Sequence, residues 1–250
     1  MMRKYDISAT IVLFNDDISI LQNTVDSFLN IPLTKRLFLI DNSPTNKFQK
    51  HFLHIDIEYI FVGANIGFGR AHNLILEKLL SNYHLILNPD VVFKPDIFKV
   101  LIEQLAMNVS ITFITPKVIF PTKEIQYVCR KHPTFFDLIN RKLRLSKSKI
   151  FDNEYRNKDL KQPFYPDFIH GCFMLFKTDE FLKLGGFDNR FFLYLEDADI
   201  CRTIYKAGNK ILFYPKVEVI HHLQKGSSKS VKLFFRHLSS SIKYFLKWGF

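Results

Sequence analysis

The fold is decided within residues 7–42, which read ISATIVLFNDDISILQNTVDSFLNIPLTKRLFLIDN. This stretch opens with an apolar, β-branched run at 7–14 and closes with a second one at 36–41, and both runs are typical of strands. Between them, Leu21, Val25, Phe28 and Leu29 recur at the spacing of one helix face. A strand, a helix and a strand in this order predict a parallel β-α-β unit.

The same alternation continues along the chain. We expect strands at 57–62, 84–88, 111–115, 172–177, 211–214 and 217–221, and helices at 68–80, 96–107 and 197–207, the last ended by Gly208. Residues 121–166 interrupt the pattern with Arg, Lys, Asn, aromatic residues and prolines. The sequence therefore predicts one α/β domain over residues 1–227, with 121–166 as an inserted, partly mobile segment, and a C-terminal helix over 228–250.

Composition limits the class of protein. With 250 residues, of which 47% are hydrophobic, the chain can bury the core of one large α/β domain, which excludes a disordered protein. Its three widely spaced cysteines match neither a disulfide framework nor a zinc spacing, and residues 1–6 lack the pattern of a secretory signal. These features predict a cytoplasmic protein. The formal charge of +11 predicts attraction to a polyanion: nucleic acid, nucleotide phosphates or an anionic membrane.

Polar residues follow three of the expected strands. Asp41 and Asn42 end one strand, Asn88 and Asp90 follow another, and His221 ends the last. Taken singly, the first two sites are equally typical of turns, and a lone histidine is more often structural. In open α/β sheets, however, ligands bind beyond the carboxyl ends of the strands. Asp90 and His221 together predict a divalent-cation site that a diphosphate would complete.

A glycine-rich loop, GANIGFGR at residues 63–70, leads into an expected helix. Glycines there would let backbone amides approach a phosphate or a sugar closely. Taken alone, the loop is equally consistent with a simple turn. Its spacing is not that of the dinucleotide-binding fingerprint, which argues against a dehydrogenase.

The most informative stretch is GGFDNRFFLYLEDADIC at residues 185–201. Glu196, Asp197 and Asp199 lie at the start of an amphipathic helix, where capping and the helix dipole would account for one or two acids. Those effects do not account for the aromatic residues that precede them. A carboxylate beside aromatic rings and other acids holds its proton more strongly and can act as a general base.

In their order, these motifs resemble those of bacterial family 2 glycosyltransferases with the GT-A fold, especially the rhamnosyltransferase-like branch. The resemblance covers about residues 5–227, with the insertion poorly matched. It rests on VLFN at 12–15, Asp41 with Asn42, NIGFG at 65–69 through Asn73, NPD at 88–90, HGCFM at 170–174, the acid block (residues 185–201) and His221.

The resemblance implies a GT-A fold: a mixed, mainly parallel sheet flanked by helices. It implies Asp197 as catalytic base with Glu196 as supporting acid, and Mn²⁺ or Mg²⁺ held by Asp90 and His221. Asn88 stands where the family carries the first aspartate of its metal motif, and Asp41 is expected to recognise the donor base. The implied donor-binding residues are Phe14, Asn15, Asp41, Asn42, Asn65, Gly67, Arg70, Asn73, Asn88, Asp90 and Gly171.

The implied activity is inverting, metal-dependent transfer of a hexose from dTDP-rhamnose or a UDP-hexose. The acceptor would be a hydroxyl of a polyprenyl-diphosphate-linked surface polysaccharide or O-antigen intermediate. Two alternatives come from other classes. A nucleic-acid-binding protein would use the basic, aromatic-rich surface, but it leaves the acid block without a purpose. A nucleotidyltransferase would carry a basic, glycine-rich signature near the start, which residues 12–17 lack.

Residues 225–250 contain basic side chains and no acidic one. From Val231 onward an apolar stripe recurs at helical spacing, flanked by lysines and Arg236. The stripe consists of Val231, Phe234, Phe235, Leu238, Ile242, Phe245 and Leu246, and the flank of Lys229, Lys232, Arg236, Lys243 and Lys247. The pattern is typical both of a terminal helix packed on the core and of one lying on the inner-membrane surface, and the two are compatible.

Overall fold

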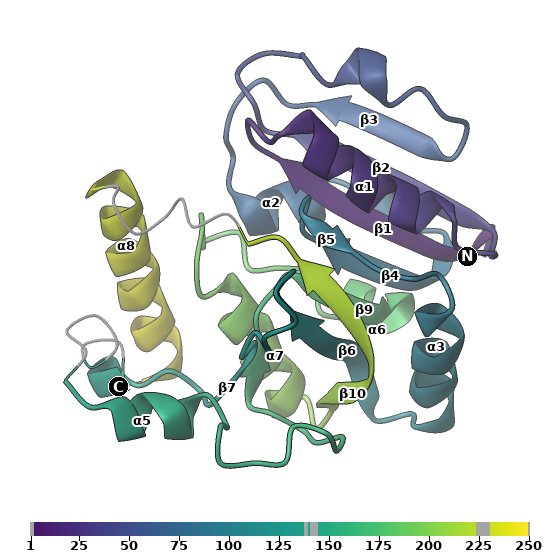
Figure 1. The fold of residues 1–250 in the computed structure, drawn as a ribbon. Coiled ribbons are helices and arrows are strands. Elements are labelled where there is room, and N and C mark those ends of the chain that lie inside the picture. Colours follow the sequence, from purple (N-terminus) through teal and green to yellow (C-terminus); the bar gives the residue numbers. More distant parts are fainter. Residues whose placement is uncertain (1–2, 138–139, 141–144, 224–230, 250) are drawn as a thin grey trace.

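A mixed sheet forms the centre of the chain (Figure 1). In this computed structural model, residues 3–137, 140, 145–223 and 231–249 are described. Within them the sheet has eight strands in the order β3-β2-β1-β4-β9-β6-β10-β5. Their bounds are β1 Tyr5–Leu13, β2 Lys35–Asp41, β3 Ile57–Phe61, β4 Ser81–Leu87, β5 Val91–Val92, β6 Ile111–Ile119, β9 Phe173–Lys177 and β10 Lys210–His221. A separate antiparallel pair joins β7 (Cys129–Arg130) to β8 (Phe168–Ile169).

Most neighbouring strands of the large sheet are parallel. Strands β3, β2, β1 and β4 form a parallel half, and β6 and β10 are parallel to each other. Strand β9 runs antiparallel between β4 and β6, and β5 is antiparallel to β10. The expectation of a mixed, mainly parallel sheet is therefore confirmed.

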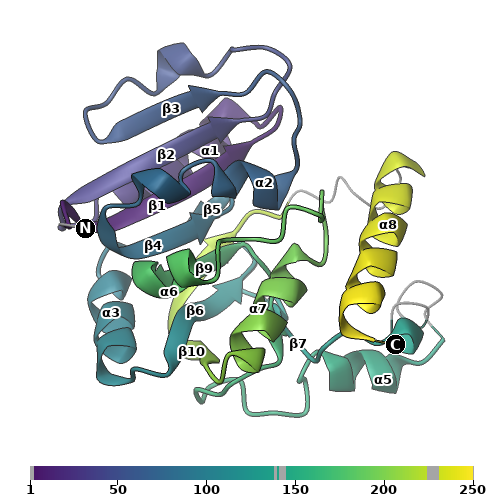
Figure 2. The same cartoon turned by 180° about the vertical axis from the view of Figure 1, so that it is seen from behind.

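Helices cover both faces of this sheet. Helix α1 lies on one face, whereas α2, α6 and α7 lie on the other, as the two opposite views show (Figures 1 and 2). The helices are α1 Ile18–Leu29, α2 Phe68–Asn73, α3 Ile97–Met107, α5 Lys147–Asn153, α6 Thr178–Lys183, α7 Glu196–Lys206 and α8 Val231–Trp248, with 3-10 turns at Gln49–His51 and Leu76–Lys78. Helix α1 begins where the Asp17 carboxylate accepts the backbone N–H groups of Ser19 and Ile20, as an N-cap does.

Two predicted elements differ in the structure. The helix expected over 68–80 ends at Asn73, whose side chain is hydrogen-bonded to Phe187, and a 3-10 turn then leads the chain into β4. The two strands expected at 211–214 and 217–221 are one strand, β10. Its pairing with β6 shifts register between Tyr214 and Glu218, where Pro215 removes a backbone donor.

The described part of segment 121–166 packs on the domain. Val128, Cys129 and Tyr155 are buried, and β7 pairs with β8, immediately before β9. This part of the segment therefore reaches the same edge of the sheet as the polar residues singled out above. The three cysteines of the chain are buried free thiols.

Helix α8 is attached to the segment around α7. Tyr244 and Phe245 are buried, and Ser240 Oγ donates to the Leu193 carbonyl at 2.8 Å. At the far end of α8, Lys247 pairs with Asp188 and Asp199, and Trp248 Nε1 donates to Asp199 Oδ1 at 2.7 Å. The helix therefore packs on the domain. In the part of the chain that is described, no helix has the length and hydropathy that crossing a membrane requires.

Of the predicted apolar stripe, only Phe245 takes part in this contact. Phe245 is buried, but the other members of the stripe are exposed: Val231, Phe234, Phe235, Leu238, Ile242 and Leu246. The basic flank instead turns inward, because Arg236 lies over the Phe192 ring and Lys243 donates to the Arg190 carbonyl. Lys229, like the predicted boundary at 227–228, lies outside the described residues, as does the side chain of Lys232.

Candidate active site

The polar residues predicted from the strand ends lie at one edge of the sheet. Strands β1, β2, β4 and β10 are parallel in direction and end at Leu13, Asp41, Leu87 and His221. Because β9 runs the other way, it begins at this edge and brings residues 170–172 there. This is the edge at which open α/β sheets bind their ligands.

Asp41 and Asn42 are buried beneath this edge. One oxygen of Asp41 accepts the backbone N–H of Ser43 at 2.8 Å, and the other accepts the hydroxyl of Tyr59. The Asn42 side-chain amide donates to the carbonyl of Gly67 at 3.2 Å. Both residues hold the loops that surround the edge, and recognition of the donor base by Asp41 stays a prediction.

Asp16 is a further carboxylate at this edge, beyond those predicted from the strand ends. It is half-buried, and its Oδ2 accepts the Phe14 backbone N–H at 2.6 Å. Burial raises the pKa of Asp16, and the nearby charges of Asp90 and Asp41 raise it further. Neighbouring Asn15 has a φ of 59° and donates its N–H to Ser43 Oγ. The sequence held one sign of it, because the polar residues Asn15, Asp16 and Asp17 directly follow the strand expected at 7–14.

Asp90 and His221 form a buried pair. Their Oδ1 and Nε2 atoms are 3.2 Å apart. The other ring nitrogen of His221 donates to Gln126 Oε1 at 2.9 Å, and Gln126 Nε2 donates to the His221 carbonyl. Burial lowers the pKa of His221, but its hydrogen bonds with Asp90 and Cys172 outweigh burial and raise it to about 10. Gln126 therefore holds Nδ1, so that Nε2 is the nitrogen of His221 that meets Asp90.

This pair suits a divalent cation that a substrate also ligates, because a cation between the two side chains would replace the proton on His221 Nε2. A metal-binding histidine ordinarily donates its second nitrogen to a fixed acceptor, and Gln126 is such an acceptor here. Among the residues that the structure describes, no group of three or more His, Cys, Asp or Glu side chains could hold a metal ion. Asp90 and His221 would thus supply two ligands, and phosphate oxygens would supply others, as is usual for Mg²⁺. Asn88 borders the pair, with its N–H donated to the Cys172 carbonyl.

The glycine-rich loop contacts the acid block directly. Gly67 has a φ of 96°, and a Cβ there would lie 2.3 Å from the carbonyl oxygen of Phe192. The next residue, Phe68, donates its N–H to that same oxygen at 3.0 Å. Asn65 supports the turn by accepting the Gly67 N–H at 3.1 Å. Position 67 therefore requires glycine for two reasons, the close approach of the Phe192 carbonyl and the positive φ.

Arg70 and Asn73 extend this contact. Arg70 Nε donates to the Asn189 carbonyl at 2.7 Å. The Asn73 side chain donates to the Phe187 carbonyl and accepts the Phe187 N–H, at 2.7 and 2.9 Å. The structure thus places both residues in the joint between α2 and the acid block. Their contact with a donor stays a prediction, as does that of Phe14, whose side chain is exposed.

Two residues in left-handed conformation introduce α7. Tyr194 and Leu195 have φ values of 72° and 66°, which cost free energy for side chains other than glycine. Their backbone turns the chain so that Glu196 and Asp197 occupy the first turn of α7. Asp199, by contrast, is paired with Lys247 and Trp248 and serves the attachment of α8.

Asp197 is the carboxylate that suits a base. Its Oδ1 accepts the Ala198 N–H at 2.8 Å, and its Oδ2 lies 3.3 Å from the Gly171 nitrogen and 3.5 Å from His170 Nδ1. Burial raises the pKa of Asp197, but His170 and these backbone N–H groups outweigh burial and bring it below the ordinary value. Asp197 is therefore ionised at neutral pH.

Glu196 has the opposite character. It is buried, and its Oε2 has no hydrogen-bond partner among the described residues. Burial, together with the negative charge of Asp197, raises the pKa of Glu196 to about 8. At pH 7 the first turn of α7 therefore carries a neutral carboxylic acid beside a carboxylate, the division of roles that acid–base chemistry uses.

Replacing Glu196 with Gln should make the protein more stable than the wild type as pH rises. Native Glu196 keeps its proton up to about pH 8, whereas the unfolded chain releases it near 4.5, so wild-type stability falls across that window. The Gln variant should lack this fall, so by pH 8.5 its free energy of unfolding should exceed that of the wild type by on the order of a few kcal/mol. Thermal unfolding from pH 5 to 8.5 checks this, with exposed Glu77→Gln as control. A constant difference between variant and wild type would refute it.

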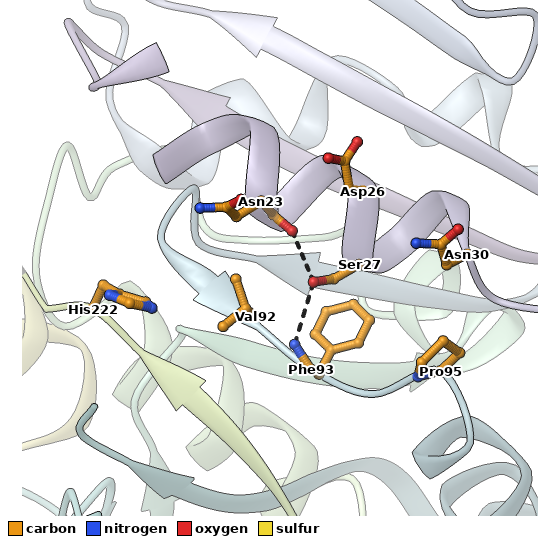
Figure 3. A pocket seen from close by; sticks show the side chains of 8 residues that line it. All are labelled: Asn23, Asp26, Ser27, Asn30, Val92, Phe93, Pro95 and His222. Carbon is orange, nitrogen blue, oxygen red and sulfur yellow. Dashed lines mark hydrogen bonds between the residues drawn. The ribbon is translucent and has the colours of Figure 1, made fainter. Parts of the chain in front are cut away.

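A pocket of about 350 Å³ lies between β5 and α1, on the side of β5 opposite the Asp90–His221 pair (Figure 3). His222, the residue after the end of β10, lines it, whereas His221 meets Asp90. The pocket has a polar rim from α1 that includes Asn23 and Asp26. Neither Asp90 nor Asp197 lines it, so it is separate from the site described above.

Comparison with known proteins settles the family. The family model described as glycosyl transferase family 2 matches residues 8–180. The chain belongs to glycosyl transferase family 2. This assignment agrees with the resemblance found in the sequence, and it makes the protein a glycosyltransferase.

Two curated relatives are rhamnosyltransferases. The chain is 27% identical over 206 residues to rhamnosyltransferase WbbL of Escherichia coli K12, covering 78% of this chain and 75% of that protein. It is 24% identical over 199 residues to N-acetylglucosaminyl-diphospho-decaprenol L-rhamnosyltransferase of Mycobacterium tuberculosis. That match covers 73% of this chain and 63% of the mycobacterial protein, so the chain spans less than two thirds of that relative.

A solved structure confirms the fold. GalNAc-T7, crystallised with UDP, GalNAc and Mn²⁺, superposes with a TM-score of 0.73 at 17% identity. The match covers 98% of this chain and 49% of that one. This likeness establishes the GT-A fold of the family 2 glycosyltransferase, as the sequence analysis expected.

Proposed function

We propose that this family 2 glycosyltransferase transfers one sugar, with inversion, from a nucleoside-diphosphate donor to a hydroxyl of a lipid-linked glycan. The observation that carries the proposal is the convergence of two groups. Asp197 contacts Gly171, and His221 of the Asp90 pair contacts the next residue, Cys172. Asp197 and the Asp90–His221 pair thus contact two adjacent residues, which supports a base and a cation site close together.

Each residue of the site has a separate role in the proposed reaction. Asp197, which is ionised, accepts the proton of the acceptor hydroxyl as that oxygen attacks the anomeric carbon. One base without an enzyme nucleophile gives a single displacement, which inverts the anomeric configuration. Asp90 and His221 would hold Mn²⁺ or Mg²⁺, which would supply positive charge to balance the leaving diphosphate. Gly67 and its neighbours in the loop approach the donor through backbone atoms.

For the substrates we propose dTDP-rhamnose as donor, with a UDP-hexose as second choice. Both curated relatives named above are rhamnosyltransferases, and the name of the mycobacterial one specifies a decaprenol-linked N-acetylglucosamine diphosphate. We propose the same chemical class of acceptor here, a sugar on a polyprenyl diphosphate. The product would be a surface polysaccharide or O-antigen intermediate made on the cytoplasmic side of the inner membrane.

A panel of nucleotide sugars tests this function. Thermal unfolding is followed with dTDP-rhamnose, UDP-glucose, UDP-galactose and a short DNA duplex, each with and without MnCl₂. The proposal expects dTDP-rhamnose, or else a UDP-hexose, to raise the unfolding temperature only when Mn²⁺ is present. Stabilisation by DNA alone, or by no nucleotide sugar, would contradict it.

The exposed face of α8 offers a contact for the membrane that carries such an acceptor. Phe235 and Leu246 are 60% and 76% exposed on it. Deleting α8 is a poor test, because this would remove buried Tyr244 and leave Asp199 without Lys247. We therefore expect the double substitution Phe235→Ser, Leu246→Ser to lower sedimentation with anionic vesicles. Unchanged sedimentation would refute a membrane role for this face.

A further inference from the structure

The turn between β8 and β9 places a histidine beside the proposed base. His170 Nδ1 lies 3.5 Å from Asp197 Oδ2, and the two side chains are 39% and 16% exposed. His170 precedes Gly171, whose N–H approaches the same carboxylate oxygen at 3.3 Å. Two adjacent residues therefore present nitrogen atoms to Oδ2 of Asp197, while Oδ1 is held by Ala198.

The other ring nitrogen of His170 determines which proton faces Asp197. Arg130 Nε lies 3.3 Å from His170 Nε2, and a guanidinium can only donate. His170 Nε2 must therefore accept, so in the neutral imidazole the proton is on Nδ1. That is the nitrogen beside Asp197. With the opposite tautomer, two lone pairs would face each other across 3.5 Å and two N–H donors would meet at Arg130.

Arg130 is itself held in place by an ion pair with Glu154. Its Nη1 lies 2.8 Å from Glu154 Oε1, and both side chains are almost fully buried, at 7% and 8% exposed. Glu154 also pairs with Arg156 at 2.5 Å. A buried charge pair of this kind has a defined geometry, because leaving either partner alone would be costly. Arg130 and Glu154 both belong to segment 121–166, whose described part thus reaches the proposed base through one histidine.

We propose that Arg130 and His170 are positioning residues for Asp197, with Arg130 selecting the imidazole tautomer that presents Nδ1–H to the carboxylate. This inference rests on the proposed function, in which Asp197 is the base. The hydrogen keeps Asp197 Oδ2 in place and favours its ionised form. The charged or titratable groups around Asp197 are Glu196, Asp199 and Cys201 on α7, and His170 with Arg130 and Glu154 behind it.

The first test measures the tautomer directly and needs no activity. Protein labelled with ¹⁵N-histidine is observed by two-bond ¹H–¹⁵N correlation, and the His170 signals are assigned by their loss in His170→Asn. The expected result is the Nδ1–H tautomer in the wild type and its loss of dominance in Arg130→Lys, which keeps the charge beside Glu154 but removes Nε. A wild-type His170 in the Nε2–H form would overturn the proposal.

The second test is the pH profile of kcat/KM with dTDP-rhamnose and a synthetic N-acetylglucosaminyl-diphospholipid. His170→Ala should move the ascending limb, where Asp197 loses its proton, about one unit to higher pH, so activity below the limb falls about tenfold. Arg130→Lys should move it in the same direction. In His170→Asn the amide N–H replaces Nδ1–H, so the limb should return part of the way to its wild-type position. A merely structural role for His170 would not predict this return.

The matched control is Arg156→Lys. Arg156 binds the same Glu154 and stacks on Tyr127, whereas the guanidinium that donates to His170 Nε2 is that of Arg130. The Arg156→Lys variant should leave both the His170 tautomer and the ascending limb of the pH profile unchanged. If Asp197→Asn is inactive but His170→Ala keeps the wild-type limb, the positioning role is wrong and the proposed function stands. If the wild type transfers no sugar, the proposed function fails. If Asp197→Asn retains turnover, Asp197 is not the base, and the positioning role fails with it.

Discussion

Replacing Asp197 with Asn is expected to lower kcat by about 10³-fold while donor affinity changes less than about twofold. Asn has nearly the same shape and can still accept the Ala198 N–H, but it cannot take a proton from the acceptor. The group acts after binding, so the loss belongs in kcat rather than in KM for the donor. Steady-state kinetics, together with calorimetric titration of the donor, measure the two quantities separately.

The matched control for this prediction is Asp188→Asn. Asp188 belongs to the same acid block, but it pairs with Arg190 and Lys247, away from Gly171. It should lose some stability, because those ion pairs lower the pKa of Asp188 and stabilise its charged form, yet it should retain turnover. Equal activity losses in the two variants would mean that the block supports the fold and that Asp197 has no special role.

Replacing Asp90 with Asn is expected to weaken Mn²⁺ binding in the presence of dTDP at least about 100-fold. Loss of a residue that only orients a metal ligand typically costs 10–100-fold, so loss of a direct ligand should cost no less. Asn also leaves His221 without the carboxylate that lies 3.2 Å away. The electron paramagnetic resonance signal of free Mn²⁺ measures the affinity independently of activity.

The control carboxylate here is Asp26→Asn on α1. Asp26 is exposed and accepts a hydrogen bond from Gln22, on the far side of β5 from the proposed cation site. Its Mn²⁺ affinity should equal that of the wild type. Unchanged affinity in Asp90→Asn would show that the Asp90–His221 pair is an ordinary buried ion pair, and the cation would have to bind elsewhere.

The sheet and its functional edge could be predicted because they depend on local patterns. Apolar runs and helix spacing in residues 7–42 specify a β-α-β unit, and polar residues at strand ends then fall at one edge. Asp41, Asp90 and His221 were found in this way. Asp16 was missed because it follows its strand within a polar run in which any residue is also typical of a turn.

The rest depends on contacts between distant residues. Gln126 meets His221 across 95 positions, and Arg130 meets His170 across 40. Both lie in a segment without periodicity, so no local signal marks them. Periodicity did reveal an apolar face on α8, but it cannot say which face finds a partner. The acid block binds the face with Ser240 and Tyr244 and leaves Phe235 outside.

The strand order also has a consequence for how the chain is synthesised. Strands β1 to β4 can pair as soon as residue 87 has emerged, but β6 has both of its neighbours, β9 and β10, later in the chain. Until Phe173–Lys177 is made, β4 and β6 each present an unpaired edge, the kind of surface through which nascent chains aggregate. Ribosome-bound chains that stop before residue 173 should therefore be the ones that chaperones retain most strongly, because β9 covers the edge of β4 and one edge of β6, and β10 later covers the other.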